Sequence, residues 1–271
     1  MSYKTILVRS EADWGSDRAV EVAIDVARLF DAAILGVGAE ALDPVAYNFT
    51  DGGVVTAVLD QIDTDLASAA TRFRALTKDA RLNTSWISSS DYPLDAMNRH
   101  ARGADLLVTR RPDKHASATN SCTPADLVLE TGLPVLLAAD GAGALKAAQV
   151  VVAWHDRREA RRAVSDAMPF LMRADCVHLI SVRPPEDQAD AITGLMEVQK
   201  RLVRHGVEVK TEVFAPSRRG VAADLDAAAD RLGADLIVSG AYSHNRVREW
   251  VLGGVTQDLM AASRKFLLLS R

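Results

Sequence analysis

The strongest constraint on the fold is that the sequence repeats itself. The segment GADLLV at Gly103–Val108 recurs as GADLIV at Gly233–Val238, 130 residues later. Near the start of the chain, the apolar run Ile6–Val8 matches Val150–Val152 at a spacing of 144, so the first copy holds about 14 additional residues. Each copy is long enough to bury a hydrophobic core of its own. The repeat therefore predicts two tandem domains, residues 1–140 and 146–271, joined by a linker of small residues.

Within each copy, short apolar runs alternate with segments of helical periodicity. In the second copy the runs typical of strands are Val150–Ala153, Cys176–Val182, Val207–Phe214, Leu236–Ser239 and Phe266–Leu269. Helices are expected between them, for example over 188–204 and 221–232, where a glycine follows the last helical turn. Strands that are separated by helices run parallel, with helices on both faces. The expected fold class is α/β, with two tandem, doubly wound, five-stranded parallel-sheet domains.

Composition excludes several classes of function. The chain has 32 Lys and Arg against 36 Asp and Glu, a formal net charge of −4, and only 5% aromatic residues. It therefore lacks the surplus of cations with which proteins bind nucleic acids. No apolar run approaches the ~20 residues that cross a bilayer, and the N-terminus resembles a strand, not a signal peptide. Two distant cysteines, Cys122 and Cys176, predict reduced thiols. We expect a cytoplasmic protein that binds neither nucleic acid nor membrane.

A glycine-containing loop in the second copy is the best candidate for a ligand site, because doubly wound sheets bind ligands beyond the carboxyl ends of their strands. Gly240 and Ser243 are followed, after nine further residues, by Gly253, Gly254, Val255 and Thr256 at the start of the last helix. Glycine lets the backbone approach a ligand, and N–H groups at a helix N-terminus bind phosphate. The residues alone support two interpretations equally: the loop binds phosphate, or its glycines only allow the chain to turn.

With this loop, the sequence resembles the universal stress protein family in its tandem two-domain form. The family's loop signature is Gly-x2-Gly-x9-Gly-(Ser/Thr), extended by a hydrophobic residue and Ser/Thr. Gly240, Gly253, Val255 and Thr256 match it, while Ser243 replaces the second glycine and Gly254 the Ser/Thr. The resemblance covers essentially the whole chain. It implies a Rossmann-like fold of the adenine nucleotide alpha hydrolase-like type, and ATP, with or without Mg²⁺, as the ligand.

The resemblance also implies where the adenine base and the ribose lie, namely against the ends of the first and second strands of the second copy. The matching residues are Ala153, Trp154, His155 and Val182. The family usually has an Asp at the position of His155, which accepts hydrogen bonds from the ribose hydroxyls, whereas an imidazole makes only one such bond. Asp156 is an alternative acceptor, although it would point a different way. Trp154 either packs between helix and sheet or contacts the nucleotide.

The first copy lacks the glycines of this loop. Its equivalent segment runs from Arg110 to Pro124, and a proline has no N–H to offer to a phosphate. Glu11 stands where the second copy has His155. Arg110 and Arg111 either hold an anion or are a solvated pair of charges. We therefore expect a degenerate nucleotide site in domain 1. The additional stretch Gly38–Gly53 is expected to form a lid over the strand ends or to cover a partner surface.

These observations lead to three functional hypotheses. The sequence has no motif for a zinc site, a serine nucleophile or a Walker lysine, so at most slow, incidental ATP hydrolysis is expected. The first hypothesis is a stress-response protein whose C-terminal domain binds ATP as a regulatory ligand. The second is an interaction scaffold without nucleotide, built as an internal pseudo-dimer, with a protein partner or a second copy of the chain. The third is an ATP-using enzyme of the related alpha hydrolase-like architecture.

Overall fold

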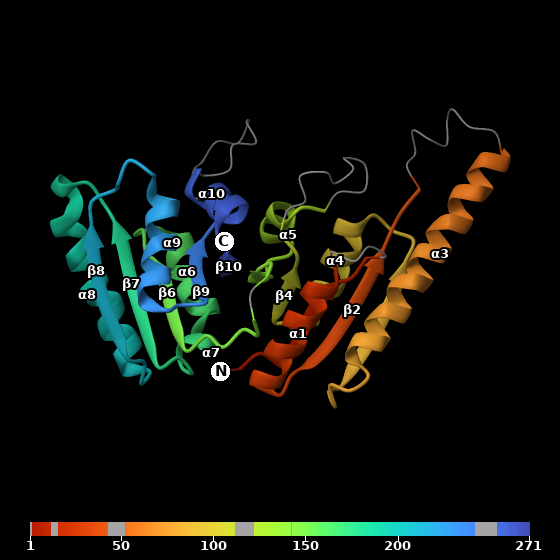
Figure 1. The fold of residues 1–271 in the computed structure, drawn as a ribbon, viewed down its shortest axis with the longest axis horizontal. Helices are drawn as coiled ribbons and strands as arrows, with labels where there is room; N and C mark the ends of the chain where they lie inside the picture. Colours follow the sequence, from red (N-terminus) through yellow and green to blue (C-terminus); the bar gives the residue numbers. More distant parts are fainter. Residues whose placement is uncertain (1, 12–15, 43–51, 112–121, 142, 242–253) are drawn as a thin grey trace. The chain divides into compact units, whose positions relative to one another are not determined.

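The computed structural model describes residues 2–11, 16–42, 52–111, 122–141, 143–241 and 254–271. These residues form two compact units, Tyr3–Ala138 and Ala139–Arg271, which we call the N-terminal and the C-terminal unit (Figure 1). The sequence also predicted a degenerate nucleotide site in the first domain and an intact one in the second. The fold by itself does not test this difference, which stays a prediction.

The N-terminal unit is a five-stranded parallel sheet with the strand order β3-β2-β1-β4-β5. Right-handed crossovers place α1 and α3 on one face and α4 and α5 on the other, and the helices of each pair contact one another (Figure 1). Its elements are β1 (Thr5–Arg9), α1 (Asp17–Phe30), β2 (Ala33–Ala39), α3 (Gly52–Thr77), β3 (Thr84–Ser89), α4 (Pro93–Ala101), β4 (Leu106–Thr109), α5 (Pro124–Glu130) and β5 (Val135–Leu137).

The C-terminal unit repeats this topology, with the strand order β10-β9-β6-β7-β8 and parallel pairing throughout. The first strand, β6, lies between the second and the fourth, so the strand order reverses beside it. Its elements are β6 (Gln149–Ala153), α6 (Arg158–Asp166), α7 (Met168–Leu171), β7 (Cys176–Val182), η2 (Pro185–Asp187), α8 (Gln188–Arg204), β8 (Val209–Phe214), α9 (Val221–Leu232), β9 (Leu236–Gly240), α10 (Gly254–Ala262) and β10 (Phe266–Ser270). The predicted fold class is confirmed.

The aspartate of the repeated GAD motif has the same structural role in both units. The carboxylate of Asp105 accepts hydrogen bonds from the backbone N–H groups of Lys4 at 2.7 Å and Thr5 at 2.9 Å. The carboxylate of Asp235 accepts equivalent bonds from Lys146 at 2.7 Å and Ala147 at 3.1 Å. Each aspartate therefore ties the chain entering the first strand to the start of the fourth. This contact explains why the motif recurs.

The inserted residues of the first copy fall partly into regular structure. Gly38 belongs to β2 and Gly53 to α3, which has 26 residues where its counterpart α8 has 17. Residues 43–51, with Pro44, Tyr47 and Phe49, lie outside the described residues. The predicted lid therefore stays a prediction. Within the described ranges, none of the helices is long and apolar enough to cross a membrane.

Both cysteines are buried and unbridged. Burial raises the pKa of the Cys122 thiol to about 11, and it also raises the pKa of Cys176. Because the thiolate is the reactive form of cysteine, both side chains act as small apolar residues of the two cores.

Candidate functional site

A pocket of about 320 Å³ opens at the carboxyl ends of β6, β7 and β9 and at the start of α10. It lies where the strand order of the C-terminal unit reverses, which is the usual ligand site of a doubly wound sheet. Ser243 and Gly253 lie outside the described residues. The other predicted site residues all line the pocket: Ala153, Trp154, His155, Val182, Gly240, Gly254, Val255 and Thr256.

Gly240 brings the end of β9 against the first turn of α6. A Cβ at this position would lie 2.6 Å from the backbone nitrogen of Ala160 and 2.6 Å from the carbonyl carbon of Glu159. Backbone atoms cannot move aside as the end of a flexible side chain can, so only glycine fits here. The sequence suggested either a turn or an approach to a ligand. The structure adds a third reason for this glycine, the close approach of two backbone segments.

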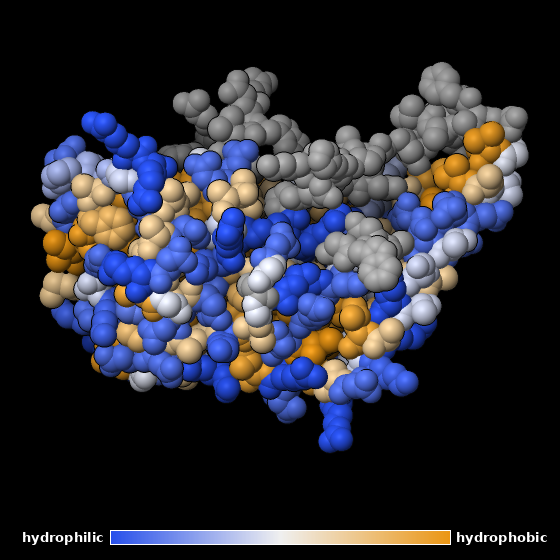
Figure 2. Space-filling view, in the orientation of Figure 1, coloured by the Kyte–Doolittle hydropathy of each residue, from blue (hydrophilic) through white to orange (hydrophobic). Residues whose placement is uncertain are grey.

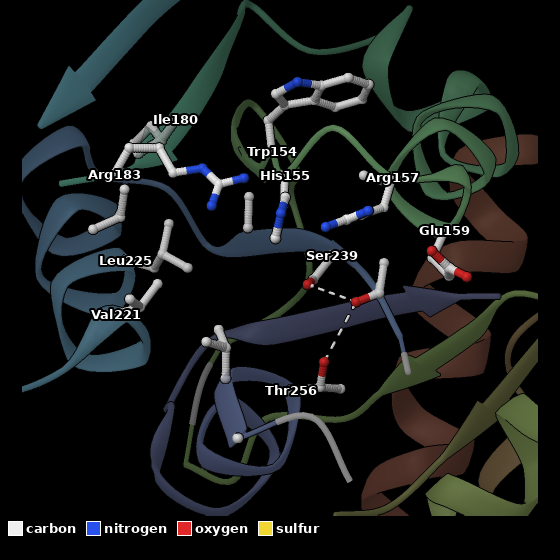
Figure 3. Close-up of a pocket in the computed structure, with 16 residues that line it drawn as sticks. Trp154, His155, Arg157, Glu159, Ile180, Arg183, Val221, Leu225, Ser239 and Thr256 are labelled. Carbon is white, nitrogen blue, oxygen red and sulfur yellow. Dashed lines mark hydrogen bonds between the residues drawn. The ribbon is translucent and has the colours of Figure 1, made fainter. Parts of the chain in front are cut away.

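Polar contacts to Gly240 connect β9 to α10. The Thr256 hydroxyl donates to the carbonyl oxygen of Gly240 at 3.4 Å, and the Ser239 hydroxyl donates to the same oxygen at 3.1 Å (Figure 3). Thr256 is buried, so its hydroxyl serves this internal contact. The first N–H groups of a helix have no partner within it. A Cβ built on Gly254, the first residue of α10, would meet none of the described residues within 4 Å. As far as these residues show, an anion can approach the backbone at the start of α10.

One wall of the pocket is apolar. It is formed by Ile180 and Val182 from β7 and by Val221 and Leu225 from α9 (Figure 3). Trp154 also lines the pocket, but it is only 5% exposed. A Cβ at Gly194 on α8 would lie 3.9 Å from its Nε1, so the indole packs against that helix. Of the two roles predicted for Trp154, packing between helix and sheet is the one that the contacts favour.

Two arginines at the pocket were missed by the sequence analysis. Arg183 directly follows the last residue of β7, and Arg157 precedes the first residue of α6. Both line the pocket, and their side chains point toward His155 from opposite sides (Figure 3). The available signal was positional, because residues just past a parallel strand lie at the edge of the sheet where ligands bind.

The carboxylates near the pocket already have basic partners. Asp156, the alternative acceptor for ribose, lies 2.9 Å from Arg161 and is not among the residues that line the pocket. Glu159 lines the pocket, and its Oε1 accepts a hydrogen bond from Arg158 at 2.7 Å. Burial by itself would raise the pKa of Glu159, but the hydrogen bonds from Arg158 and from its own backbone N–H lower it overall. Across the described ranges, no three His, Cys, Asp or Glu side chains are arranged to hold a metal ion.

The N-terminal unit has different chemistry at the equivalent place. Glu11 follows β1 as His155 follows β6, and it forms ion pairs with Arg9 and with Arg110, the latter at 3.1 Å. Arg9 also donates to the carbonyl oxygen of Cys122 at 2.9 Å. Arg110 is therefore not a solvated charge, as one prediction had it. Arg110 stands at the position that corresponds to Gly240 of β9, and its side chain is paired with Glu11.

The start of α5 is also closed by internal hydrogen bonds. The Thr123 hydroxyl accepts from the backbone N–H of Asp126 at 3.2 Å, and the Asp126 carboxylate accepts from the N–H of Thr123 at 2.9 Å. This reciprocal arrangement is a capping box. Pro124, the first residue of the helix, has no N–H. Few backbone donors are thus left for a ligand at the start of α5.

Comparison with solved structures gives the identity of the fold. A universal stress protein from Archaeoglobus fulgidus DSM 4304 matches with a TM-score of 0.73 at 15% identity, over 98% of this chain and 96% of that chain. A candidate universal stress protein from Pseudomonas aeruginosa UCBPP-PA14 matches with a TM-score of 0.64 at 15% identity, over 99% and 93% of the two chains. A functionally unknown protein from Pseudomonas aeruginosa PAO1 gives 0.62 at 15% identity, over 99% and 92%.

No protein-family model matches the sequence, and no curated protein matches it. Similarity to solved structures at 15% identity shows the fold and leaves function to be argued from the site. The resemblance predicted from the glycine loop and the repeat is confirmed at that level. The chain has the tandem fold of the universal stress proteins.

Proposed function

We propose that the C-terminal unit binds ATP, with or without Mg²⁺, as a regulatory ligand, and that the protein acts in a cytoplasmic stress response. The observation that carries this proposal is the pocket itself. It combines an apolar wall, an open helix N-terminus and three basic side chains at the switch point of the sheet. Pockets for nucleotides need these three features, since the base is apolar on its faces and the phosphates are anionic.

The residues present fit the parts of ATP in the following way. Ile180, Val182 and Leu225 offer an apolar surface for the base, and His155 lies at the predicted ribose position. The backbone at Gly254, with the positive end of the α10 dipole, suits the phosphates. In this role ATP is a regulatory ligand and not a substrate, and the fraction of protein that holds it follows the ATP concentration. Among the described lining residues Glu159 is the one carboxylate, and its pairing with Arg158 argues against a general base.

The corresponding proposal for the N-terminal unit is a degenerate site. Glu11 pairs with both Arg9 and Arg110 at the strand ends, and the capping box closes the start of α5. The charged side chains and the helix N–H groups that a nucleotide would contact are therefore already paired within the protein. We assign the N-terminal unit no ligand.

Gly254→Asp tests the phosphate assignment without damaging the helix. An acidic residue in the first turn favours a helix through its dipole, and the open space beside Gly254 accommodates a side chain. Its negative charge would repel phosphate, so titration calorimetry should show ATP affinity falling at least about tenfold. Gln257→Glu is the matched control, since it adds the same charge on an exposed position of α10 outside the pocket.

Two results would contradict parts of the proposal. If wild-type protein binds no ATP in calorimetry, and acid extraction of protein purified from cells releases no adenine nucleotide, the interaction scaffold becomes the better hypothesis. If ATP binds and Gly254→Asp binds it as well as Gln257→Glu does, the phosphates lie elsewhere in the unit.

A further inference from the structure

The ribose end of the pocket in the C-terminal unit is lined by basic side chains. His155, Arg157 and Arg183, which we call the Arg–His cluster, line this end, and the two arginine side chains converge on the imidazole (Figure 3). Within the described ranges, neither Arg157 nor Arg183 forms an ion pair. Arg183 is partly buried, so its charge is less screened by water than that of a fully exposed side chain.

Among the described residues that line the pocket, Glu159 is the one carboxylate that could accept bonds from ribose hydroxyl groups. The two nearest carboxylates in the sequence are engaged elsewhere, Asp156 with Arg161 and Glu159 with Arg158. A carboxylate accepts hydrogen bonds from both hydroxyls of a ribose, whereas guanidinium groups only donate. In nucleotide-binding α/β folds, an acidic residue recognises a free ribose hydroxyl and a nearby arginine accommodates a phosphate attached to it. The Arg–His cluster has the chemistry of the second case.

The start of α10 lies on the other side of the pocket. Figure 3 shows Thr256 of α10 across the pocket from His155, with Ser239 of β9 between them. The open N-terminus of α10 suits one phosphate group, and the Arg–His cluster suits another through charge-assisted, forked hydrogen bonds. A ligand with one phosphate group could neutralise only one of these two sites.

We propose that the pocket selects nucleotides whose ribose carries a phosphate on its 2′ or 3′ oxygen in addition to the phosphate on its 5′ oxygen. Arg183 and Arg157 hold the ribose phosphate, His155 donates one further hydrogen bond to it, and the start of α10 holds the 5′ phosphate. This inference rests on the proposed function, because it assumes that the pocket binds a nucleotide. It refines the proposed ligand, because ATP would fill the site at the start of α10 and leave the Arg–His cluster unfilled, whereas an adenine nucleotide with a phosphorylated ribose would fill both.

The test compares ligands that differ by a single phosphate. Titration calorimetry of the full chain is carried out with AMP, adenosine 2′,5′-bisphosphate, adenosine 3′,5′-bisphosphate and ATP, at one fixed salt concentration. One of the two bisphosphates should bind at least about tenfold more tightly than AMP, since hydrogen bonds between charged groups are the strong ones. Which bisphosphate gains identifies the oxygen that carries the phosphate.

Variants assign that gain to the Arg–His cluster. Arg183→Ala should weaken binding of the preferred bisphosphate much more than binding of AMP, so that most of the preference over AMP is lost. Arg218→Ala is the matched control, because Arg218 is an exposed arginine of the same unit outside the pocket. His155→Asp should reverse the preference, since its carboxylate repels a ribose phosphate and accepts bonds from free hydroxyls.

Two results would overturn the inference while leaving the proposed function intact. The first is ATP binding by wild-type protein with both bisphosphates no tighter than AMP. The second is an equal loss of affinity for AMP and both bisphosphates in Arg183→Ala, which would place the arginines at the 5′ phosphate. If none of the four ligands binds, the proposed function itself fails.

Discussion

Gly240 illustrates how one residue can serve both the fold and the site. Its missing side chain allows the end of β9 to lie against the first turn of α6, and its carbonyl oxygen accepts the hydroxyl bonds of Ser239 and Thr256. The sequence showed that a glycine stands here at the spacing of a nucleotide loop. It could not show that the nearest atoms belong to another backbone segment, because this depends on how α6 packs.

Gly240→Ala should therefore destabilise the protein whether or not a ligand is present. The new Cβ would have to displace backbone atoms 2.6 Å away, and overpacking of this kind costs about 1–3 kcal/mol. Urea denaturation should show a lower midpoint than in wild-type protein. Gly254→Ala is the control and should denature with a nearly unchanged midpoint, since open space surrounds its Cβ. Equal midpoints for the two variants would show that α6 can move away at little cost.

His178 is a second residue whose environment has measurable consequences. It lies on β7, 8% exposed, with its Nε2 3.0 Å from Oε1 of Gln149. Burial lowers the pKa of His178 below its ordinary value of 6.5, and the charge of Lys210 on β8 lowers it further. The folded protein keeps the imidazole neutral at a pH where the unfolded chain binds a proton. This contribution to stability is complete above pH 6.5 and is lost as the pH falls toward the lowered pKa.

We expect His178→Leu to weaken the pH dependence of unfolding. Leucine suits the position, because Leu35 has the same register in the N-terminal unit. Between about pH 7.5 and 5.5, the urea midpoint of wild-type protein should fall more than that of the variant. The exposed His205 provides the control, and His205→Gln should keep the pH dependence of wild-type protein. Parallel pH profiles for wild type and His178→Leu would rule out a neutral, buried imidazole.

At the scale of whole elements, the sequence predicted the bounds of a helix accurately where a residue that stops helices follows its last turn. Helices α8 and α9 have the predicted bounds because Gly206 and Gly233 follow them with φ of +78° and +66°, a conformation that other residues rarely adopt. Ala160, Val164, Ala167 and Leu171 have the spacing of one helical face, but the structure divides this segment into α6 and α7. Pro169 in the first turn of α7 explains the break, since a proline cannot continue the hydrogen bonding of α6.

The sequence could predict the parts of the candidate site that the backbone forms, but not the side chains that converge on it. Ala153 and Val182, which the family resemblance assigned to the nucleotide, and Gly254, which the loop spacing assigned, all line one pocket, and their binding roles stay predictions. Arg157 and Arg183 were missed because arginine is common at exposed loop positions. Only the packing of the strands and helices around the pocket shows that these two side chains converge. The ion pairs of Glu11 depend in the same way on β1 and β4 lying side by side.

Those ion pairs give a prediction for the strand ends of the N-terminal unit. Glu11→Gln removes the charge that pairs with Arg9 and Arg110, whose side chains are 12% and 25% exposed. Loss of a half-buried pair should cost about 1–2 kcal/mol, between the values for surface and buried pairs. Glu21→Gln is the control, because its pair with Arg18 is half exposed and should contribute little. The idea fails if both variants unfold at the same urea concentration.

At the scale of the whole molecule, the two units share a scaffold and differ in what their strand ends offer. The shared part is carried by buried strands and by Asp105 and Asp235, which bind the entering chain in the same way. Figure 2 shows polar residues over much of the visible surface, with apolar side chains gathered over the first turns of α3, where Val54 and Leu59 are each 46% exposed. Repetition has thus preserved the sheet while the residues beyond it diverged.

This divergence predicts that each chain binds at most one nucleotide, in the C-terminal unit. A phosphate site needs a close approach to the backbone together with N–H groups that have no other partner. The start of α10 provides open space at Gly254, whereas α5 begins with Pro124 and uses its first donors in a capping box. Calorimetry of the full chain should give a stoichiometry near one. Gly254→Asp should lower the affinity of this binding at least about tenfold, while Glu11→Gln should leave it unchanged even though it destabilises the N-terminal unit. Two equivalent sites per chain, or nucleotide binding that is unchanged in Gly254→Asp and is lost in Glu11→Gln, would show that the arginines of the N-terminal unit hold phosphate without a glycine loop.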